Sequence, residues 1–282
     1  MKIPFNKIRD EVSHIEIFQA LERGFIKFRI NFYLVGATAR DVWMRGVYDL
    51  PPKRATGDID FGIMIKDSFV FDDLKSYLIE EEGFVPSKGN EFVLIWKDKT
   101  PVDLIPFGDL EREGIVTVKG TGFTGMNVVG FREVYEQASE EIITEEQQFK
   151  VCTLPGLVIL KLIAWDDRPE VRRDDIDDIA EIIKNYFHLN AEVIFEQHSD
   201  LFTDEIELAE IASQFLGREI GKIVSGNPKL VERIKGILEN GLNDDNNLAE
   251  LFASESDETI EYSKSLISHI KKGIEEVTSE IK

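Results

Sequence analysis

The pattern of strand and helix signals changes near residue 150, and this change constrains the fold more than any other feature of the sequence. Before it, short apolar runs typical of strands alternate with helical patterns. The strand-like runs lie at residues 31–35, 58–65, 92–96 and 102–107, and the helical patterns at 8–27, 38–45 and 71–82. This order predicts an α+β head, in which helices pack on a small mixed β-sheet.

After residue 150, strand signals are nearly absent and apolar residues recur at helical spacing. These helical patterns lie at residues 154–165, 175–187, 205–215, 228–238 and 258–277, and residues 240–247 have the composition of a polar loop. We therefore expect two domains, the head over residues 1–150 and a helical C-terminal domain over 151–282.

Composition and charge exclude several classes of protein. The 282 residues are 43% hydrophobic and 31% charged, which is typical of a globular protein. No apolar run approaches the roughly 20 residues that cross a bilayer, and the first residues lack the apolar core of a secretion signal. Cys152 is the single cysteine, so an internal disulfide is excluded. We expect a cytoplasmic protein with no membrane partner.

The formal charge of −21 disfavours long nucleic acid as a partner. Binding to a phosphate backbone depends on neutralisation by Lys and Arg side chains, and an acidic field repels the backbone. The same excess of acids is also explained by solubility alone, without any partner.

Three aspartates in strand contexts carry the chemistry that the sequence predicts. Asp58 and Asp60 are two residues apart in a strand-like run, so both side chains point to the same face. Asp103 lies early in a later run, and three carboxylates converge if the two strands are neighbours. Carboxylates this close repel one another unless a cation compensates them, and hard oxygen ligands suit Mg²⁺. The alternative is a set of solvated aspartates on a strand face.

A glycine turn lies upstream of the aspartates. Residues 34–41, Leu-Val-Gly-Ala-Thr-Ala-Arg-Asp, combine the end of a strand, a turn at Gly36 and the start of a helix. Backbone N–H groups at such a helix start can hold a triphosphate. The small Ala37 lets a phosphate approach the main chain, and the Thr38 hydroxyl can donate to it.

These elements together resemble the nucleotidyltransferases of the DNA polymerase beta superfamily. The resemblance is carried by residues 36–38 (Gly-Ala-Thr), 56–61 (Thr-Gly-Asp-Ile-Asp-Phe) and 102–104 (Val-Asp-Leu). Over residues 30–185 the chain is more similar to the AbiEii-like nucleotidyltransferases, the toxin class of type IV toxin–antitoxin systems. Residues 35–41 also resemble an element of tRNA CCA-adding enzymes. The chain departs from the superfamily at Ala37, where a serine or a second glycine is usual.

The resemblance implies roles for the residues that match it. Asp58 and Asp60 would hold two Mg²⁺ ions, with Mn²⁺ as an alternative, and Asp103 would be the third ligand and the base for the attacking hydroxyl. Gly36, Ala37, Thr38 and Arg40 would bind the triphosphate of an NTP such as ATP.

A second cluster lies at the start of the helical domain. Lys161 is followed by Asp175 and Asp178, which are three apart and share a helix face. By resemblance to the downstream AbiEii-like motif, Lys161 would contact the nucleotide phosphates, positioned by the two aspartates. A shift of one residue would give this role to Asp174 and Asp177. The alternative is an acidic first helical turn that stabilises the helix dipole.

The sequence therefore predicts a Mg²⁺-dependent transfer of a nucleoside monophosphate (NMP) from an NTP to an acceptor. The acceptor is left open between a protein, a tRNA and a small molecule. As a hypothesis, the chain is a toxin restrained by an antitoxin protein. One alternative is a small-molecule adenylyltransferase of the antibiotic-modifying kind. Another is a degenerate nucleotide-binding or protein-binding module, which the departure at Ala37 favours.

Overall fold

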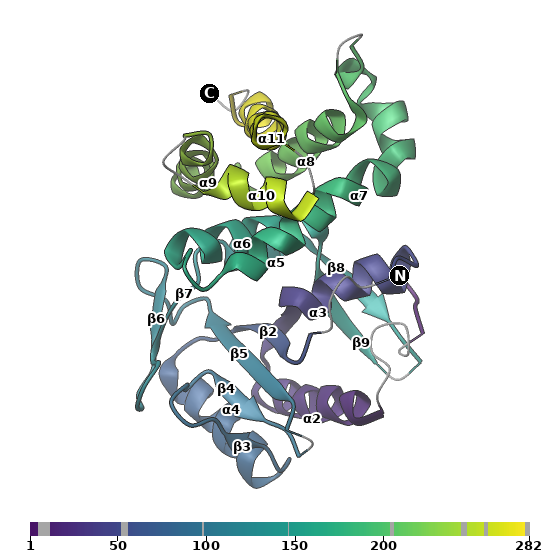
Figure 1. The fold of residues 1–282 in the computed structure, drawn as a ribbon. Coiled ribbons are helices and arrows are strands. Elements are labelled where there is room, and N and C mark those ends of the chain that lie inside the picture. Colours follow the sequence, from purple (N-terminus) through teal and green to yellow (C-terminus); the bar gives the residue numbers. More distant parts are fainter. Residues whose placement is uncertain are drawn as a thin grey trace. The chain divides into compact units, whose positions relative to one another are not determined.

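The chain divides into two compact units, Met1–Thr153 and Leu154–Lys282. The computed structural model describes residues 1–4, 12–51, 56–97, 99–145, 147–203, 206–243, 247–256 and 259–279. Each unit has its own core. The first is an α+β unit built on a mixed sheet, and the second is helical, as Figure 1 shows.

The first unit is built on a seven-stranded sheet with the strand order β3-β4-β5-β2-β1-β9-β8. These strands are β1 (Asn31–Val35), β2 (Ile59–Met64), β3 (Val85–Pro86), β4 (Val93–Ile95), β5 (Pro101–Phe107), β8 (Ser139–Ile143) and β9 (Gln148–Cys152). β6 (Ile115–Thr117) and β7 (Gly125–Asn127) form a separate two-stranded sheet. The order brings β1, β2 and β5 side by side at the centre.

The central strands combine both pairing directions. β1 pairs with β2 in antiparallel fashion, whereas β2 pairs with β5 and β1 with β9 in parallel. The mixed sheet predicted from the sequence is thus confirmed. The apolar residues of β2 alternate in the way that a buried strand requires, with Ile59, Phe61 and Ile63 all fully buried.

Helices cover both faces of this sheet. On one face, α2 (Val12–Phe28) packs Phe18 and Phe25 against Phe61, with ring centroids 5.3 and 5.9 Å apart. α4 (Ser68–Glu80) lies beside α2 on the same side, where Leu74 and Leu78 contact Gly24 (Figure 1).

On the other face, α5 (Phe131–Gln137) packs against the buried rings of the central strands. Phe131 and Tyr135 contact Tyr33 of β1 and Phe107 of β5, with ring centroids 5.5–6.4 Å apart. Asp60 is adjacent in sequence to the Ile59 and Phe61 of the α2 face, so its side chain points to this α5 face.

The helix after β1 differs from its predicted extent of residues 38–45. α3 (Gly36–Asp41) begins at the glycine itself and continues directly into the π-helical segment η1 (Val42–Val47). The structure places Gly36 at the first helical position, so the turn and the helix start coincide.

Other elements of the first unit were missed or shifted. The predicted helix 8–27 is α2, and Ile8 lies outside the described residues. No strand or helix was predicted at the positions of β3, β6, β7, α5, β8 and β9. β8 and β9 carry few signals, since Ile142 is the one fully buried residue of β8 and only part of β9 is apolar. β9 is positioned in the sheet by its parallel pairing with β1, which is far from it in the sequence.

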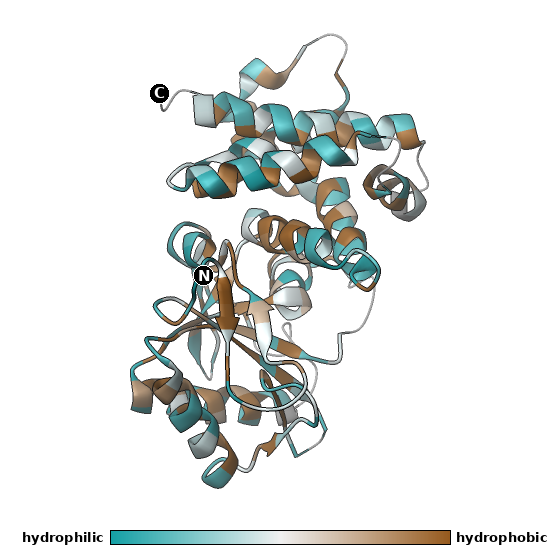
Figure 2. Cartoon of the chain, turned by 90° about the vertical axis from the view of Figure 1, so that its left-hand side faces the viewer, coloured by the Kyte–Doolittle hydropathy of each residue, from teal (hydrophilic) through white to brown (hydrophobic). Residues whose placement is uncertain are grey.

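The second unit is helical, as predicted. Its elements are α6 (Leu154–Asp167), α7 (Arg173–Gln197), the 3₁₀ segment η2 (Ser199–Leu201), α8 (Leu208–Val224), α9 (Pro228–Gly241), α10 (Leu248–Ser256) and α11 (Ile260–Ser279). Most of these helices carry hydrophobic and hydrophilic residues in separate stripes (Figure 2). α6 is the exception, because it is buried on nearly all sides.

α8 and α11 pack tightly against each other in this unit. A side chain at Gly217 would meet the Ile270 carbonyl oxygen at 2.1 Å, and one at Gly273 would meet the Gln214 carbonyl oxygen at the same distance. Glycine is required at both positions because the two backbones touch there. α10 was not predicted, and α7 and α8 run well beyond their predicted ends. No helix in the described parts of the chain is long and apolar enough to cross a membrane.

Candidate functional site

The register of β2 and β5 brings Asp60 and Asp103 together. The two residues are direct partners in this parallel pair, between the partners Ile59–Val102 and Phe61–Leu104. Neighbouring strands lie about 4.8 Å apart, and partners in a parallel pair point to the same face. Both aspartates are half-buried, whereas the residues on either side of each are fully buried. Two carboxylates therefore lie side by side on the α5 face of the sheet.

Asp58 lies one residue before β2 and is held by two threonine hydroxyls. Thr56 Oγ1 donates to Asp58 Oδ1 at 2.8 Å, and Thr38 Oγ1 donates to the Asp58 carbonyl oxygen at 3.1 Å. The Thr38 bond joins the residue before β2 to α3, the helix that follows β1.

The glycine turn lies directly against Asp60. Gly36 has a φ of +66°, a left-handed conformation that favours glycine. A Cβ at this position would lie 2.1 Å from Asp60 Oδ2 and 2.7 Å from Asp60 Cγ. The neighbouring Val35 is the register partner of Asp60, which explains the approach. The glycine turn and the carboxylate pair thus form one site.

The α5 face beside this site is filled by an aromatic side chain. Tyr33 packs on Gly62, where a Cβ would meet Tyr33 Cε1 at 2.3 Å. The Tyr33 hydroxyl donates to the Phe131 carbonyl oxygen at 3.0 Å, and burial raises the pKa of this hydroxyl well above its usual value. Tyr33 is therefore neutral, and its ring fills this face of the sheet at Gly62.

Three of the predicted phosphate-binding residues have buried side chains. Ala37 is 7% exposed, Thr38 is fully buried and Arg40 is 1% exposed. Arg40 donates from Nε and Nη2 to Asp41 Oδ1, at 2.9 and 2.6 Å. The structure thus gives the polar groups of Thr38 and Arg40 partners within the protein. Their contact with a nucleotide stays a prediction.

The donor atoms of the site suit a hard divalent cation. Aspartate oxygens are the ligands that Mg²⁺ and Mn²⁺ accept in proteins. Strand register places the main chains of Asp60 and Asp103 next to each other, and Asp58 lies two residues before Asp60. Within the described ranges, no three His, Cys, Asp or Glu side chains stand close enough to hold a metal ion. Mg²⁺ commonly takes only one or two protein carboxylates together with substrate phosphates, so the donor set of Asp60 and Asp103 fits this cation without a closed group of three.

The second predicted cluster also comes together, within the helical unit. Lys161 Nζ of α6 lies 2.8 Å from Asp175 Oδ1 and 2.7 Å from Asp178 Oδ2, both on α7. All three residues are buried, and Arg172 Nη1 lies 3.7 Å from Asp175 Oδ2. Asp174 is exposed, so the lysine partners are Asp175 and Asp178, without the shift of one residue.

Charge compensation governs the ionisation of Lys161. Burial alone would lower the pKa of this lysine. The two nearby carboxylates outweigh that effect, so the pKa is raised above its ordinary value of 10.5. Lys161 is therefore a charged member of a compact ion-pair cluster.

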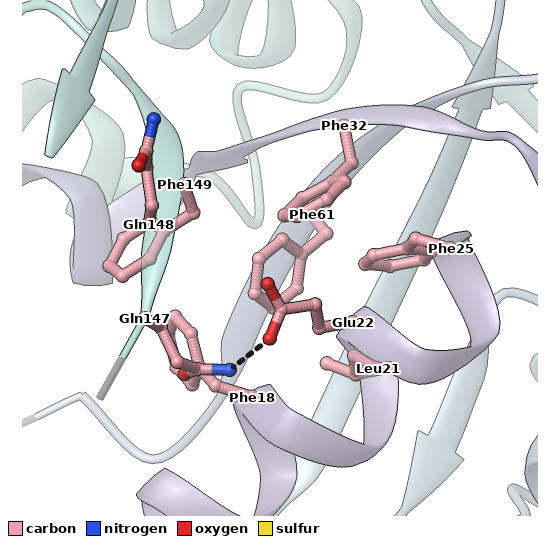
Figure 3. A pocket seen from close by; sticks show the side chains of 9 residues that line it. All are labelled: Phe18, Leu21, Glu22, Phe25, Phe32, Phe61, Gln147, Gln148 and Phe149. Atoms are coloured by element: carbon pink, nitrogen blue, oxygen red, sulfur yellow. Dashed lines mark hydrogen bonds between the residues drawn. The ribbon is translucent and has the colours of Figure 1, made fainter. Parts of the chain in front are cut away.

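A small pocket lies on the opposite face of the sheet. Figure 3 shows it between α2 and the strands, lined by Phe18, Phe61, Phe149 and other apolar residues, with Gln147 Nε2 donating to Glu22 Oε2 at 3.1 Å. Its volume of about 10 Å³ is at the lower limit for one water molecule. Since Phe61 and Asp60 point to opposite faces of β2, this pocket does not belong to the aspartate site.

Thr56 lies within a predicted motif, but no role was predicted for it from the sequence. A threonine two residues before an aspartate is placed to form a local side-chain hydrogen bond, and this spacing was the available signal. Asp41, the partner of buried Arg40, was likewise given no role.

Comparison with known proteins gives structural neighbours only. No protein family matches the chain, and no curated protein matches it in sequence. Two solved structures are similar over 67% of the chain. One is an antigenic nucleotidyltransferase-like protein from Paracoccidioides brasiliensis, with 16% identity, 90% of that protein covered and a TM-score of 0.38. The other is the antibiotic-resistance factor ANT(2'')-Ia, with 10% identity, 98% covered and a TM-score of 0.37. Because both scores are below 0.5, a function for this chain has to be argued from its own residues.

Proposed function

We propose that this protein is a nucleotidyltransferase that moves an NMP group from an NTP to a nucleophilic acceptor. The observation that carries the proposal is the pairing of Asp60 with Asp103 beside the turn at Gly36. Carboxylates placed next to a glycine-lined backbone turn combine two requirements of phosphoryl chemistry. These are a cation-binding group and a place where phosphate can approach the main chain.

The proposed reaction is an in-line displacement at the α-phosphorus of the NTP. An acceptor hydroxyl oxygen forms the new P–O bond, and the bond from the α-phosphorus to the α,β-bridging oxygen breaks, which releases pyrophosphate. Asp103 is the candidate base that takes the hydroxyl proton. Gly36 gives the triphosphate access to backbone N–H groups. Asp58, Asp60 and Asp103 would hold Mg²⁺ or Mn²⁺, which when bound would neutralise charge on the phosphoryl oxygens.

A protein or a small molecule suits the chain better as acceptor than a nucleic acid does. The formal charge is −21, and such a field opposes a phosphate backbone. A tRNA acceptor, which the family resemblance leaves open, would require a local basic surface to overcome this field.

The test incubates the purified protein with each α-labelled NTP, Mg²⁺ or Mn²⁺, and cell extract. Products are divided by their sensitivity to nuclease and protease, and small acceptors are separated by chromatography. The Asp58→Asn, Asp60→Asn double variant runs alongside. An Asp72→Asn, Asp73→Asn variant is the matched control, since these two aspartates lie exposed on α4. We expect label in wild type and in the α4 control, and none in the site variant. Equal labelling by the site variant would refute the proposal.

A second candidate is a nucleotide-binding or protein-binding module without catalysis. Two observations favour it. Ala37 stands where a hydroxyl or a second glycine is usual, and the Thr38 hydroxyl donates to the Asp58 carbonyl. This candidate is preferred if the protein binds NTPs but yields no labelled product with any acceptor class.

The toxin hypothesis adds a cellular role to the proposed activity. If unrestrained transfer onto a cellular acceptor is harmful, induced expression arrests growth, and Asp60→Asn relieves the arrest at equal protein level. An antitoxin encoded by an adjacent gene would restore growth with the wild-type chain. Normal growth on strong induction, with soluble and active protein, rules out the toxin role and leaves the transferase proposal standing.

A further inference from the structure

Asp58 differs from Asp60 and Asp103 in how its main chain is held. Asp60 is paired on both sides, with Val35 of β1 and with Asp103 of β5. β2 begins at Ile59, so Asp58 lies just outside the described strand pairing. An aspartate at a strand end needs other bonds to keep its position, since the ladder does not extend to it.

Two threonine hydroxyls supply bonds to Asp58, one to the main chain and one to the side chain. Thr38 comes from α3 and donates to the Asp58 carbonyl oxygen at 3.1 Å. Thr56 donates to Asp58 Oδ1 at 2.8 Å. The first bond holds the main chain of Asp58, and the second restricts rotation of its carboxylate.

The Thr38 bond also limits what this residue can do for a nucleotide. A hydroxyl carries one proton, and that of Thr38 is donated to the Asp58 carbonyl. The side chain of Thr38 is fully buried. A phosphate contact through this proton would therefore require the bond to Asp58 to break.

We propose that Thr38 and Thr56 are positioning residues that hold Asp58 in place beside β2, where it would serve a divalent cation, and that the Thr38 hydroxyl is not a phosphate ligand. This inference rests on the proposed function, because it assigns Asp58 to a divalent cation. Groups that orient a metal-binding side chain commonly change metal affinity by about 10- to 100-fold when removed. The loss of either hydroxyl would thus act on cation affinity, whereas affinity for NTP at saturating cation would be unchanged.

The experiment compares Thr→Val with Thr→Ser at both positions in the full-length protein. Valine keeps the shape and removes the hydroxyl, and serine keeps the hydroxyl. Thr144→Val is the matched control, since Thr144 Oγ1 also donates to a carbonyl oxygen in this unit, that of Gln147 at 3.2 Å. Mn²⁺ affinity is measured by electron paramagnetic resonance without nucleotide, and the KM for NTP is then measured at saturating Mg²⁺.

We expect Thr56→Val to weaken Mn²⁺ binding about tenfold and both serine variants to bind within about twofold of wild type. Thr38→Val should behave like Thr56→Val. If burial of Thr38 prevents that variant from folding, the half-buried Thr56 still decides the question. Unchanged Mn²⁺ affinity in Thr56→Val would overturn the inference. For Thr38, a higher KM for NTP in Thr38→Val with unchanged Mn²⁺ affinity would overturn the inference.

The inference and the proposed function can fail separately. If wild type binds Mn²⁺ and Thr56→Val weakens that binding, but no nucleotide is transferred, the inference holds and the function is wrong. If wild type transfers label and both valine variants match it in Mn²⁺ affinity, the function holds and the positioning role is wrong.

Discussion

The two acidic clusters of this protein are built in opposite ways. In the helical unit, a buried lysine lies between two carboxylates, with Lys161 Nζ within 2.8 Å of Asp175 and Asp178. In the sheet unit, strand register places Asp60 beside Asp103 and the glycine turn lies against Asp60. The first arrangement pairs opposite charges, and the second brings like charges together.

This difference separates a cluster that stabilises a fold from one that suits a ligand. Removal of either partner of a buried ion pair destabilises the protein, because the remaining charge is left uncompensated in a medium of low polarity. Asp60 and Asp103 are half-buried, so a substitution at either one leaves no charge in a fully buried position. Substitutions should therefore lower stability much more in the first cluster than in the second.

The largest effect is expected for Lys161→Met. It leaves Asp175 and Asp178 buried without their lysine, and we expect it to lower the free energy of unfolding by about 3–5 kcal/mol. Urea unfolding, with hydrogen exchange of α6 peptides, measures the loss. The Lys161→Met, Asp175→Asn, Asp178→Asn triple variant should recover much of it. A loss below about 1 kcal/mol for Lys161→Met would show that the pair is not a stability element.

Gly36→Ala is expected to have the next largest effect. The left-handed conformation at φ +66° costs a residue with a Cβ about 1–2 kcal/mol, and the added carbon would displace the Asp60 carboxylate. We expect reduced stability and loss of nucleotide transfer. Gly57→Ala is the matched control, because a Cβ there meets nothing within 4 Å. Its stability should remain within about 0.5 kcal/mol of wild type. Equal effects of the two substitutions would contradict the close approach of Gly36 and Asp60.

Asp103→Asn sharpens the comparison because its effect on stability should be small. It keeps the size of a half-buried side chain and removes its charge, and we expect the free energy of unfolding to change by no more than about 1 kcal/mol. Transfer activity should be lost at the same time. Chemical denaturation and the labelling assay on one preparation measure both. A clear loss of stability would mean that Asp103 serves the fold.

The smallest effect is the pH dependence of the Lys161 cluster. Because the folded-state pKa of Lys161 is raised above 10.5, its stabilising contribution is complete below pH 10.5 and is lost as the pH rises through the folded value. The stability difference between wild type and Lys161→Met should be constant from pH 7 to about 10 and should shrink above that. A difference that already shrinks between pH 7 and 9 would indicate a lowered pKa instead.

The parts of the fold that could be predicted are those with a strong local pattern. Short apolar runs marked β1, β2 and β5, and amphipathic spacing marked α4, α9 and α11. The parallel pairing of β1 with β9 could not be predicted, since nothing local to Gln148–Cys152 specifies a partner more than 100 residues away in the chain. Short, half-exposed strands such as β8 could not be predicted either, because too few of their residues are buried to give a periodic pattern.

The candidate site shows the same division between local and long-range information. Strand alternation predicted that Asp58 and Asp60 share a face, and register supplied the partner Asp103. The burial of Thr38 could not be predicted, because it depends on packing between α3 and β2. A hydroxyl in a glycine turn suggested a phosphate contact, but its bond to Asp58 depends on a neighbour 20 residues away.

The central claim is that the aspartates beside Gly36 serve nucleotidyl transfer. The most direct test supplies one NTP labelled either at the α- or at the γ-phosphate, and compares wild type with Asp60→Asn. The account predicts that wild type attaches the α-label to an acceptor, releases the γ-label as pyrophosphate, and does neither after Asp60→Asn. Attachment of the γ-label, or α-label transfer that survives Asp60→Asn, would contradict it.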